Sequence, residues 1–287
     1  MPVPEQKVNE TPRPIEPHEF EQIRQLAHRT FGLDLRSGKE ELVSARLQRL
    51  LRAEGFRSFH QYYRHVLEDR TGEALAAMVD ALATNHTAFL RERDHFDFLR
   101  DHAAELARGR GSLEVWSAAC ATGEEAWTLL CLLNETLPGQ RIHITATDIS
   151  NKALRIASKA EYPAERCKDL PRAWLSRYFT PCAGSPPRSQ VAPEFRVQVT
   201  FRRVNLVERL VMPQRFAVIF CRNVMIYFDR ETQEQVVGKL ADCLEPGGYL
   251  FIGHAESLNR IEHALEYIRP AIYRKTGRTV VRWNRSS

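Results

Sequence analysis

The stretch FAVIFCRNVMIYFD, residues 216–229, decides the fold of this chain. Its residues 217–220 are all apolar, a pattern typical of a strand that is buried on both faces inside a parallel sheet. Cys221, Arg222 and Asn223 follow directly, and ligands of open parallel sheets bind beyond the carboxyl ends of the strands. The stretch therefore predicts a parallel sheet with a binding site at the end of this strand.

The residues that follow complete a βαβ unit. Asp229 is a favourable N-cap for a helix predicted over residues 231–244. The turn sequence Pro246-Gly247-Gly248 then leads into a second apolar strand, predicted over residues 249–253. A helix between two strands is the crossover that joins parallel neighbours.

A second unit of this kind lies upstream and gives the first indication of a ligand. An apolar strand over residues 113–117 is followed by a run of small residues, 118–123, and by a helix predicted over residues 124–135. Small side chains allow a ligand to approach the backbone closely. The next strand, residues 141–147, ends at Asp148, where doubly wound folds place an acid that accepts hydrogen bonds from ribose hydroxyls. This layout predicts a nucleoside site.

The run of small residues lacks the glycine-rich phosphate fingerprint, because Gly123 is the only glycine between Leu113 and Pro138. Glu124 and Glu125 begin the helix, where they complement its dipole and would repel a pyrophosphate. One interpretation of the two acids is an ordinary helix N-terminus. The other is a phosphate-free nucleoside, and S-adenosylmethionine, with its ribose and its cationic sulfonium and ammonium groups, is the common one.

The composition is that of an ordinary globular protein, with 43% apolar and 27% charged residues in 287, enough for one large domain and a small one. No segment approaches the roughly 20 continuous apolar residues of a membrane-spanning helix. Residues 1–17 are rich in proline and have no apolar core, so we predict a flexible tail that is neither signal peptide nor anchor. We expect a monomer located in the cytoplasm.

Neither the cysteines nor the charge indicates a metal or a nucleic acid. The six cysteines form no C-x-x-C pair, and the spacing of histidines offers no set of zinc ligands, so we predict reduced thiols and no structural metal. The net charge of +5 is modest, and only residues 274–285 form a basic stretch, so we expect no nucleic-acid partner. The cysteines are Cys120, Cys131, Cys167, Cys182, Cys221 and Cys243.

A separate helical region precedes the α/β part. Between residues 17 and 78 apolar residues recur at helical spacing, and four glycines divide the region into four short helices. Several arginines give these helices a basic face, which is either a solvated surface or a docking surface for an acidic helical partner. The arginines are Arg46, Arg49, Arg52, Arg57 and Arg64.

A polar string, residues 84–92, joins the two regions. Taken alone, Thr84 and Asn85 predict a helix cap followed by an amphipathic helix. Together with the segments described above, however, the string resembles the successive motifs of the CheR chemotaxis-receptor methyltransferases, over residues 19–274. The matching segments are Asn85-x-Thr87-x-Phe89-x-Arg91-Glu92, residues 116–125, residues 146–149, Asn205-Leu206, residues 220–228 and Gly253-His254-x-Glu256-Ser257.

The resemblance implies a fold and a reaction. The fold is α/β: a class I S-adenosylmethionine-dependent methyltransferase with a Rossmann-like doubly wound sheet over residues 96–276, after an all-helical domain over residues 18–80 and a linker over residues 81–95 that contributes to the cofactor site. An antiparallel β-subdomain would be inserted at about residues 179–202, followed by a basic tail over residues 277–287. The reaction is methyl transfer from S-adenosylmethionine to glutamates on the cytoplasmic helices of chemoreceptors, the protein partner, with S-adenosylhomocysteine as product.

The resemblance also implies roles for individual residues. Asn85, Thr87 and Arg91 would contact the methionine part of the cofactor, and Glu124 or Glu125 its amino group. Asp148 would bind the ribose, and Asn205 with Leu206 the adenine. Cys221, Arg222, Asn223 and Tyr227 would line the donor methyl group, and the catalytic roles fall to Arg91, which would hold the substrate carboxylate, and Tyr227, which would orient it. The alternatives are an ion pair with Glu92 or Glu125 for Arg91, and a core aromatic for Tyr227.

Two other functions fit some of these features. One is a signalling adaptor that keeps the fold without turnover, and the other is an RNA methyltransferase, favoured by the basic tail. Base-methylating enzymes commonly carry an Asn-Pro-Pro-Tyr-type string after the fourth strand, whereas this chain has Arg222 to Tyr227, and an arginine suits a carboxylate better.

The prolines of the predicted insertion bear on receptor recognition. In relatives that bind a receptor's C-terminal peptide, the peptide adds as a strand to the edge of the β-subdomain. Pro186, Pro187 and Pro193 flank the predicted edge, and proline lacks the N–H group that strand addition requires. We therefore predict recognition through the basic N-terminal helices without such a peptide.

Overall fold

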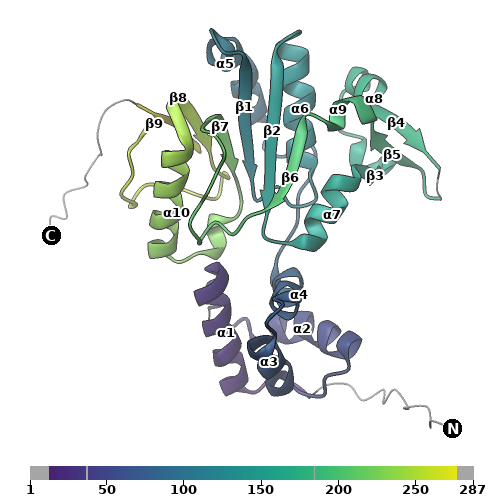
Figure 1. The fold of residues 1–287 in the computed structure, drawn as a ribbon, viewed down its shortest axis with the longest axis vertical. Coiled ribbons are helices and arrows are strands. Elements are labelled where there is room, and N and C mark those ends of the chain that lie inside the picture. The colour runs from purple at the N-terminus through teal and green to yellow at the C-terminus, as the bar shows by residue number, and fades with distance from the viewer. Residues whose placement is uncertain (1–12, 37, 184, 277–287) are drawn as a thin grey trace. The chain divides into compact units, whose positions relative to one another are not determined.

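A computed structural model of the chain describes residues 13–36, 38–183 and 185–276, and these belong to two units, residues 1–84 and residues 85–287 (Figure 1). The predicted flexible tail lies largely outside the described residues, and the predicted basic tail, residues 277–287, lies wholly outside them. Pro17, assigned to the tail, is the first residue of a helix, where its fixed φ and missing N–H are tolerated. No helix among the described residues is both long and apolar enough to cross a membrane.

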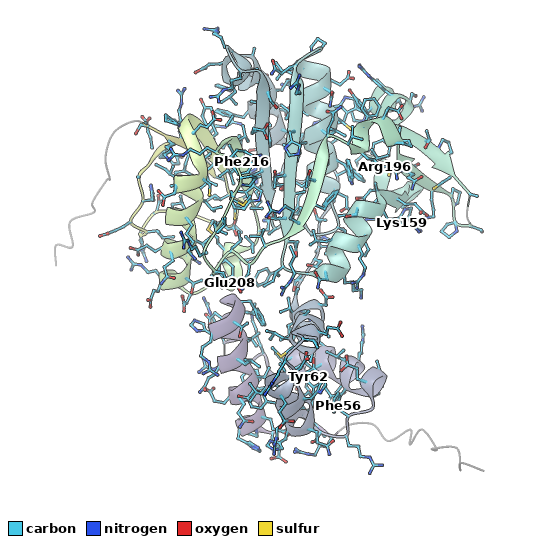
Figure 2. All side chains as sticks on the ribbon, viewed as in Figure 1. Phe56, Tyr62, Lys159, Arg196, Glu208 and Phe216 are labelled. Atoms are coloured by element: carbon cyan, nitrogen blue, oxygen red, sulfur yellow. The ribbon has the colours of Figure 1, made fainter. Side chains whose placement is uncertain are left out.

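The first unit is the predicted group of four helices. They are α1 (Pro17–Phe31), α2 (Glu40–Glu54), α3 (Phe59–Glu68) and α4 (Glu73–Leu82). Gly32 and Gly55 end α1 and α2 in the left-handed conformation, which glycine adopts without steric cost. The side chains of Leu47, Leu51 and Tyr62 are fully buried, and Phe56 packs edge-on against Tyr62 with ring centroids 5.4 Å apart (Figure 2). The apolar side chains that recur at helical spacing thus form the core of this unit.

The second unit is built on a seven-stranded sheet in the order β6-β2-β1-β7-β8-β10-β9 (Figure 1). The first five strands in this order are parallel, and β10 and β9 continue the sheet in antiparallel fashion. The strands are β1 (Ser112–Ala118), β2 (Arg141–Asp148), β6 (Val199–Arg203), β7 (Phe216–Cys221), β8 (Leu244–Phe251), β9 (Leu265–Arg269) and β10 (Ile272–Lys275). The predicted doubly wound class I fold is confirmed.

Helices cover both faces of this sheet. The side chains of α5 (Arg93–Ala107) and α6 (Glu124–Thr136) belong to the same apolar cluster as Phe220, and those of α10 (Arg230–Cys243) belong to a second cluster with Phe216 and Ile219. Successive side chains of a strand point to opposite faces, so β7, all of whose residues are buried, contributes to both clusters (Figure 2 labels Phe216). The N-cap of α10 is Asp229, which accepts from the backbone N–H of Thr232 at 2.8 Å, as predicted.

The predicted insertion is a separate three-stranded antiparallel sheet. It contains β3 (Glu161–Pro163), β4 (Phe179–Cys182) and β5 (Arg188–Val191) in the order β3-β5-β4. The predicted antiparallel insertion is present, and β4 and β5 lie within the predicted residues 179–202, but its bounds differ: β3 precedes them, residues 193–196 form the short helix α9, and residues 199–203 form β6, an edge strand of the main sheet. Within β6 Val199 is buried and its neighbour Thr200 is exposed, but such alternation indicates one covered face and not the sheet to which a strand belongs.

The prolines of this small sheet also lie differently from the prediction. Pro186 and Pro187 precede β5, which is the central strand, so they do not flank an edge. The edge strands β3 and β4 themselves contain Pro163 and Pro181. Because proline has no N–H group, each edge lacks one donor for strand addition.

The predicted helix at Thr84 and Asn85 is wrong. Residues 83–88 are irregular and α5 begins at Arg93, after Leu90 and Glu92 take up left-handed backbone conformations with φ of 56° each, which a right-handed helix does not accommodate. Asn85 donates its side-chain N–H to Ser150 Oγ at 3.3 Å instead of capping a helix. N-cap preference is local, and here contacts distant in sequence override it.

The strand predicted from Tyr249 begins earlier, at Leu244. Gly248 lies inside it, and a Cβ there would come within 2.8 Å of the carbonyl oxygen of Ala217, so the glycine permits β8 to approach β7.

Candidate active site

The polar residues of the site lie at the carboxyl ends of β1, β2, β7 and β8, where the parallel strands of this unit end together. Residues 85–92, before α5, reach the same edge, since Asn85 contacts Ser150 and Glu92 contacts Asn223. The run of small residues after β1 provides two further left-handed positions, Ala119 and Ala121.

Arg222 is the centre of the charged groups. Its side chain is buried, and it donates from Nη2 to the carbonyl oxygen of Arg91 at 2.5 Å. The guanidinium lies 3.4 Å from Glu92 Oε2 and 3.6 Å from Glu125 Oε2, and its Nε and Nη1 make no hydrogen bond within the described structure. A buried donor without a hydrogen-bond partner is costly, and the two carboxylates offset the buried positive charge.

The two glutamates that begin α6 face different partners. Glu125 accepts from Ser117 Oγ at 2.7 Å and faces Arg222. Glu124 is fully buried, accepts from Thr122 Oγ1 at 2.7 Å and pairs with Arg166. Burial raises the pKa of both carboxyl groups, against the lowering effect of the arginines.

Asp148 connects β2 to the small-residue loop. Its Oδ2 accepts from the backbone N–H of Ala121 and its Oδ1 from that of Ser150, both at 2.9 Å. Gly123, in contrast, is required for packing, because a Cβ there would lie 2.8 Å from Ala157 Cβ and 2.9 Å from the Tyr162 hydroxyl. The small-residue loop is therefore fixed by its neighbours in the fold, with Asp148 at the edge where a ribose was predicted.

The remaining predicted residues lie on loops at the same edge of the sheet. Thr87 accepts at its carbonyl oxygen from Arg166 at 3.2 Å. Asn205 donates to Glu208 Oε1 at 2.9 Å, and Leu206 is buried beside β1 in the apolar cluster of Trp116. Residues 204–206 follow β6, and the backbone N–H of Val204 donates to the carbonyl oxygen of Asp148 at 3.1 Å, which brings this loop to the end of β2.

The alternatives for Arg91 and Tyr227 can be compared with the structure. Arg91 donates from Nη1 to the carbonyl oxygen of His86 at 2.9 Å, and it forms no ion pair with any residue that the structure describes. Tyr227 is half-buried in the turn Met225–Tyr227 (η2), so it is not a core aromatic. Cys221 is fully buried, and burial raises the pKa of its thiol well above the ordinary value.

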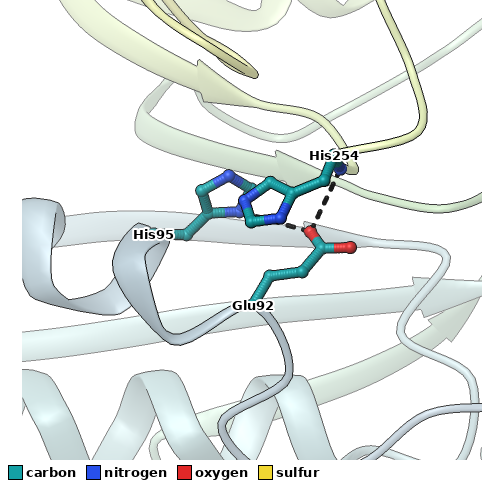
Figure 3. Close-up of side chains that lie close together, drawn as sticks. All are labelled: Glu92, His95 and His254. Atoms are coloured by element: carbon teal, nitrogen blue, oxygen red, sulfur yellow. Dashed lines mark hydrogen bonds and ion pairs between the residues drawn. The ribbon is translucent and has the colours of Figure 1, made fainter.

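Sequence reasoning gave no role to a cluster formed by Glu92, His95 and His254 (Figure 3). His95 is fully buried, its Nδ1 lies 3.6 Å from Glu92 Oε2, and His254 donates its backbone N–H to the same oxygen at 3.3 Å. Burial and the positive charge of Arg222 lower the pKa of His95 to about 4. The signal was present in the motifs that contain Glu92 and His254, but nothing in their spacing of 162 residues indicated contact.

Donor atoms of these three residues lie within 4.8 Å of one another, as the ligands of a metal ion would. The Glu92 carboxylate is already shared by Arg222 at 3.4 Å and by Asn223 Nδ2 at 3.1 Å. A guanidinium this close repels a cation, so we assign no metal to the cluster. Burial by itself raises the pKa of Glu92, but Arg222 and Asn223 outweigh it and hold that pKa below the usual value.

Comparison with known proteins identifies the family. The model of the CheR methyltransferase all-alpha domain matches residues 18–83, and that of the CheR methyltransferase S-adenosylmethionine-binding domain matches residues 85–273. The chain belongs to the CheR methyltransferase family. This CheR protein is 35% identical to the chemotaxis protein methyltransferase of Borreliella burgdorferi, over 90% of its own length and 94% of that protein.

Two further relatives are also chemotaxis protein methyltransferases. Chemotaxis protein methyltransferase 2 of Pseudomonas aeruginosa is 36% identical, over 89% of this chain and 92% of that protein. The chemotaxis protein methyltransferase of Escherichia coli is 36% identical, over 88% of this chain and 89% of that protein. The predicted family, fold and cofactor are confirmed: this CheR protein is a methyltransferase with a domain for S-adenosylmethionine.

The residues at the site fit that cofactor. Asp148 ends β2, where doubly wound folds place an acid that binds ribose hydroxyls, and Glu125 brings a carboxylate to the same edge of the sheet. The acids at the start of α6 oppose a phosphate group, which the cofactor lacks.

Proposed function

We propose that this CheR protein methylates glutamate side chains on the cytoplasmic helices of chemoreceptors, forming glutamate methyl esters as part of chemosensory adaptation. The observation that carries the proposal is Arg222, a buried guanidinium whose Nε and Nη1 have no hydrogen-bond partner among the described residues. A carboxylate accepts two parallel hydrogen bonds from such a group. The chemotaxis methyltransferases to which the chain is similar support a receptor as substrate.

The reaction requires no general base. A glutamate with its ordinary pKa near 4 is ionised at neutral pH. S-adenosylmethionine would supply a methyl group on a sulfonium: the carboxylate oxygen would form the new O–CH3 bond with its own electron pair as the S–CH3 bond breaks, giving the ester and S-adenosylhomocysteine. Rate then depends on alignment, for which good positioning contributes up to about 7 to 11 kcal/mol. Arg222 and Arg91 hold the substrate carboxylate and Tyr227 orients it.

For the cofactor, Asp148 binds the ribose, and Glu125 rather than Glu124 faces the amino group. The choice follows from burial and position, because Glu124 is fully buried and pairs with Arg166, whereas Glu125 is partly exposed and lies beside Arg222. Cys221 and Asn223 line the donor methyl group. The outer parts of the cofactor contact Asn85 and Thr87 on one side and Asn205 and Leu206 on the other.

An assay with radiolabelled S-adenosylmethionine tests this function against its two rivals. The protein is incubated with receptor-containing membranes or with RNA, and the labelled product is treated with mild base. We expect label in the receptor that base releases as methanol, because esters hydrolyse under these conditions. Label in RNA, base-stable label or absence of label would refute the proposal, the last in favour of an adaptor.

Asp148→Ala is expected to weaken binding of S-adenosylhomocysteine by about 1.5 to 3 kcal/mol, since a charge-assisted hydrogen bond to a ribose hydroxyl is lost. Titration calorimetry measures the change. Asp169→Ala, at an exposed aspartate between η1 (Ala164–Cys167) and α8 (Arg172–Tyr178), is the control that should bind normally. Unchanged affinity in Asp148→Ala would remove the ribose assignment.

Receptor recognition rests on the basic face of the first unit. Arg49, Arg52 and Arg57 are exposed, whereas Arg46 donates to the Leu82 carbonyl oxygen at 2.6 Å and so serves the unit itself. Three exposed charges on α2 and the following turn suit an acidic receptor helix and would speed encounter.

Arg52→Glu is therefore expected to lower kcat/KM for receptor by a factor of about 3 to 10, with kcat unchanged. Arg141→Glu, an exposed charge reversal at the start of β2, is the matched control. Raised salt should reduce the difference, because the screening length falls from about 10 Å at 0.1 M to about 3 Å at 1 M.

Removal of a receptor's C-terminal peptide should change little, since Pro163 and Pro181 interrupt the donors of the two edge strands. Rates on full-length and truncated receptor give the comparison. A large loss on truncation, without any effect of salt or of Arg52→Glu, would show that strand addition guides recognition.

A further inference from the structure

One buried carboxylate outside the predicted site residues connects the two loops that end β7 and β8. Glu256 follows β8 and is 9% exposed. Its Oε2 accepts from the backbone N–H groups of Asn223 at 3.0 Å and Gly253 at 2.5 Å. Its Oε1 accepts from those of Met225 at 2.8 Å and Ile226 at 3.3 Å. A single side chain thus satisfies four backbone donors from two loops.

The loops meet as closely as the backbone permits. A Cβ on Gly253 would lie 2.4 Å from Asn223 Nδ2 and 2.9 Å from Asn223 N. Asn223 has a φ of 57°, a left-handed conformation that is uncommon for a residue other than glycine. Such a conformation persists only where the surroundings determine it, and the Glu256 carboxylate is the group that holds the Asn223 N–H.

The loop held in this way carries the residues of the proposed chemistry. Arg222 precedes Asn223, whose side chain donates to Glu92, and Glu92 in turn faces the guanidinium of Arg222. Tyr227 is the last residue of the same turn, η2. The position of the arginine and the tyrosine therefore depends on where residues 223–226 are fixed.

We propose that Glu256 is a positioning residue for methyl transfer: its carboxylate sets the conformation of residues 222–227 and thereby aligns Arg222 and Tyr227 with the substrate carboxylate. The proposal rests on the proposed function for its kinetic consequence. Its structural part, the anchoring of four amides by one side chain, is independent of the substrate.

Glu256→Gln is the sharpest variant, because the amide has nearly the same shape but only one acceptor oxygen. Its NH2 group would face two backbone N–H donors, so one pair of the four hydrogen bonds is lost. Glu256→Asp keeps both oxygens on a shorter side chain and should restore part of what Gln loses. Glu135→Gln is the control, since Glu135 is a carboxylate away from the site that accepts from Arg177 and Tyr178.

The first measurement is amide hydrogen exchange in the full-length protein. In Glu256→Gln the amides of Asn223, Gly253, Met225 and Ile226 should exchange faster than in the wild type, while Glu135→Gln leaves them unchanged. Unaltered exchange in Glu256→Gln would overturn the proposal whatever the substrate proves to be.

The second measurement is kinetic, on receptor membranes with S-adenosylmethionine. Because misplacement by about 1 Å can cost roughly 100-fold, kcat of Glu256→Gln should fall about 10- to 100-fold, while the Kd for S-adenosylhomocysteine changes by less than about threefold. Glu256→Asp should recover part of kcat. A Gln variant with wild-type kcat, or one that loses cofactor affinity in proportion to kcat, would overturn the positioning role. Failure of the wild type to form an ester would instead refute the proposed function, and the exchange data would still decide the role of Glu256.

Discussion

Replacing Arg222 with methionine is expected to lower kcat for receptor methylation by about 100-fold, with the affinity for S-adenosylhomocysteine retained. The guanidinium is the buried cation at the end of β7, and without it the substrate carboxylate loses the group that aligns it. Rates at saturating cofactor, together with calorimetric binding of S-adenosylhomocysteine, separate the two effects.

The same substitution removes the partner of two acids. Glu92 and Glu125 lie 3.4 Å and 3.6 Å from the guanidinium, and removal of one partner from a buried ionic group typically costs about 3 to 5 kcal/mol. Loss of activity through unfolding must therefore be excluded. The double variant Arg222→Met with Glu92→Gln removes a negative charge together with the positive one.

We expect the double variant to regain stability without regaining turnover. Urea unfolding and kcat are measured on the same preparations of wild type, single and double variants. If turnover returned together with stability, Arg222 would be an ion of structural importance only, and the carboxylate-binding role would be wrong.

The second prediction concerns acid sensitivity and His95. Burial and Arg222 lower the pKa of this imidazole from 6.5 to about 4, so the unfolded chain takes up a proton between these values while the folded chain does not. The contribution of His95 to stability is therefore complete above pH 6.5 and declines as the pH falls toward 4. Between pH 7.5 and 5 the loss should be about 2 kcal/mol.

His95→Phe should abolish this part of the pH dependence. Neither ring nitrogen of His95 has a hydrogen-bond partner among the described residues, and the ring packs near Phe251 at 5.7 Å, so a phenyl ring suits the position. Trp116, Trp127 and Trp174 all belong to the unit of residues 85–287, so their fluorescence in urea reports on it.

The comparison of the two proteins isolates His95 from the buried acids. Burial raises the pKa of Glu124, Glu125 and Glu256, so their destabilising contribution is present at neutral pH and is relieved as the pH falls. The pH dependence of stability that these glutamates cause has the opposite sign to that of His95, and it is the same in the wild type and in His95→Phe. Equal pH dependence in both would show that His95 does not titrate as inferred.

Several parts of the fold could be predicted from local pattern. The apolar strand at residues 216–221 and the N-cap Asp229 depend on neighbours in sequence, and both are found as predicted. The position of Asp148 follows from the same logic. The small-residue turn and its helix lead into the next parallel strand, β2, and doubly wound folds place a ribose-binding acid at the end of that strand.

The alternation of apolar and polar residues could not by itself assign residues 199–203 to one sheet or the other. Their pattern suits either an inserted hairpin or an edge strand, and hydrogen bonding to β2 decides between them. The cap predicted at Thr84 and Asn85 failed for a related reason: a capping preference of about 1 kcal/mol is easily outweighed by contacts far along the chain, such as that of Asn85 with Ser150.

The sequence by itself determined the four N-terminal helices, the two βαβ units, the small-residue turn and the identity of the polar residues that end the strands, because each depends on residues close together along the chain. Only the tertiary structure decided which of the two glutamates of α6 faces Arg222. It also brought Glu92, His95 and His254 together and placed the Glu256 carboxylate against the backbone N–H of Asn223. These contacts join residues up to 162 positions apart, and whether a buried charge is paired depends on which loops the parallel strands bring to one edge of the sheet.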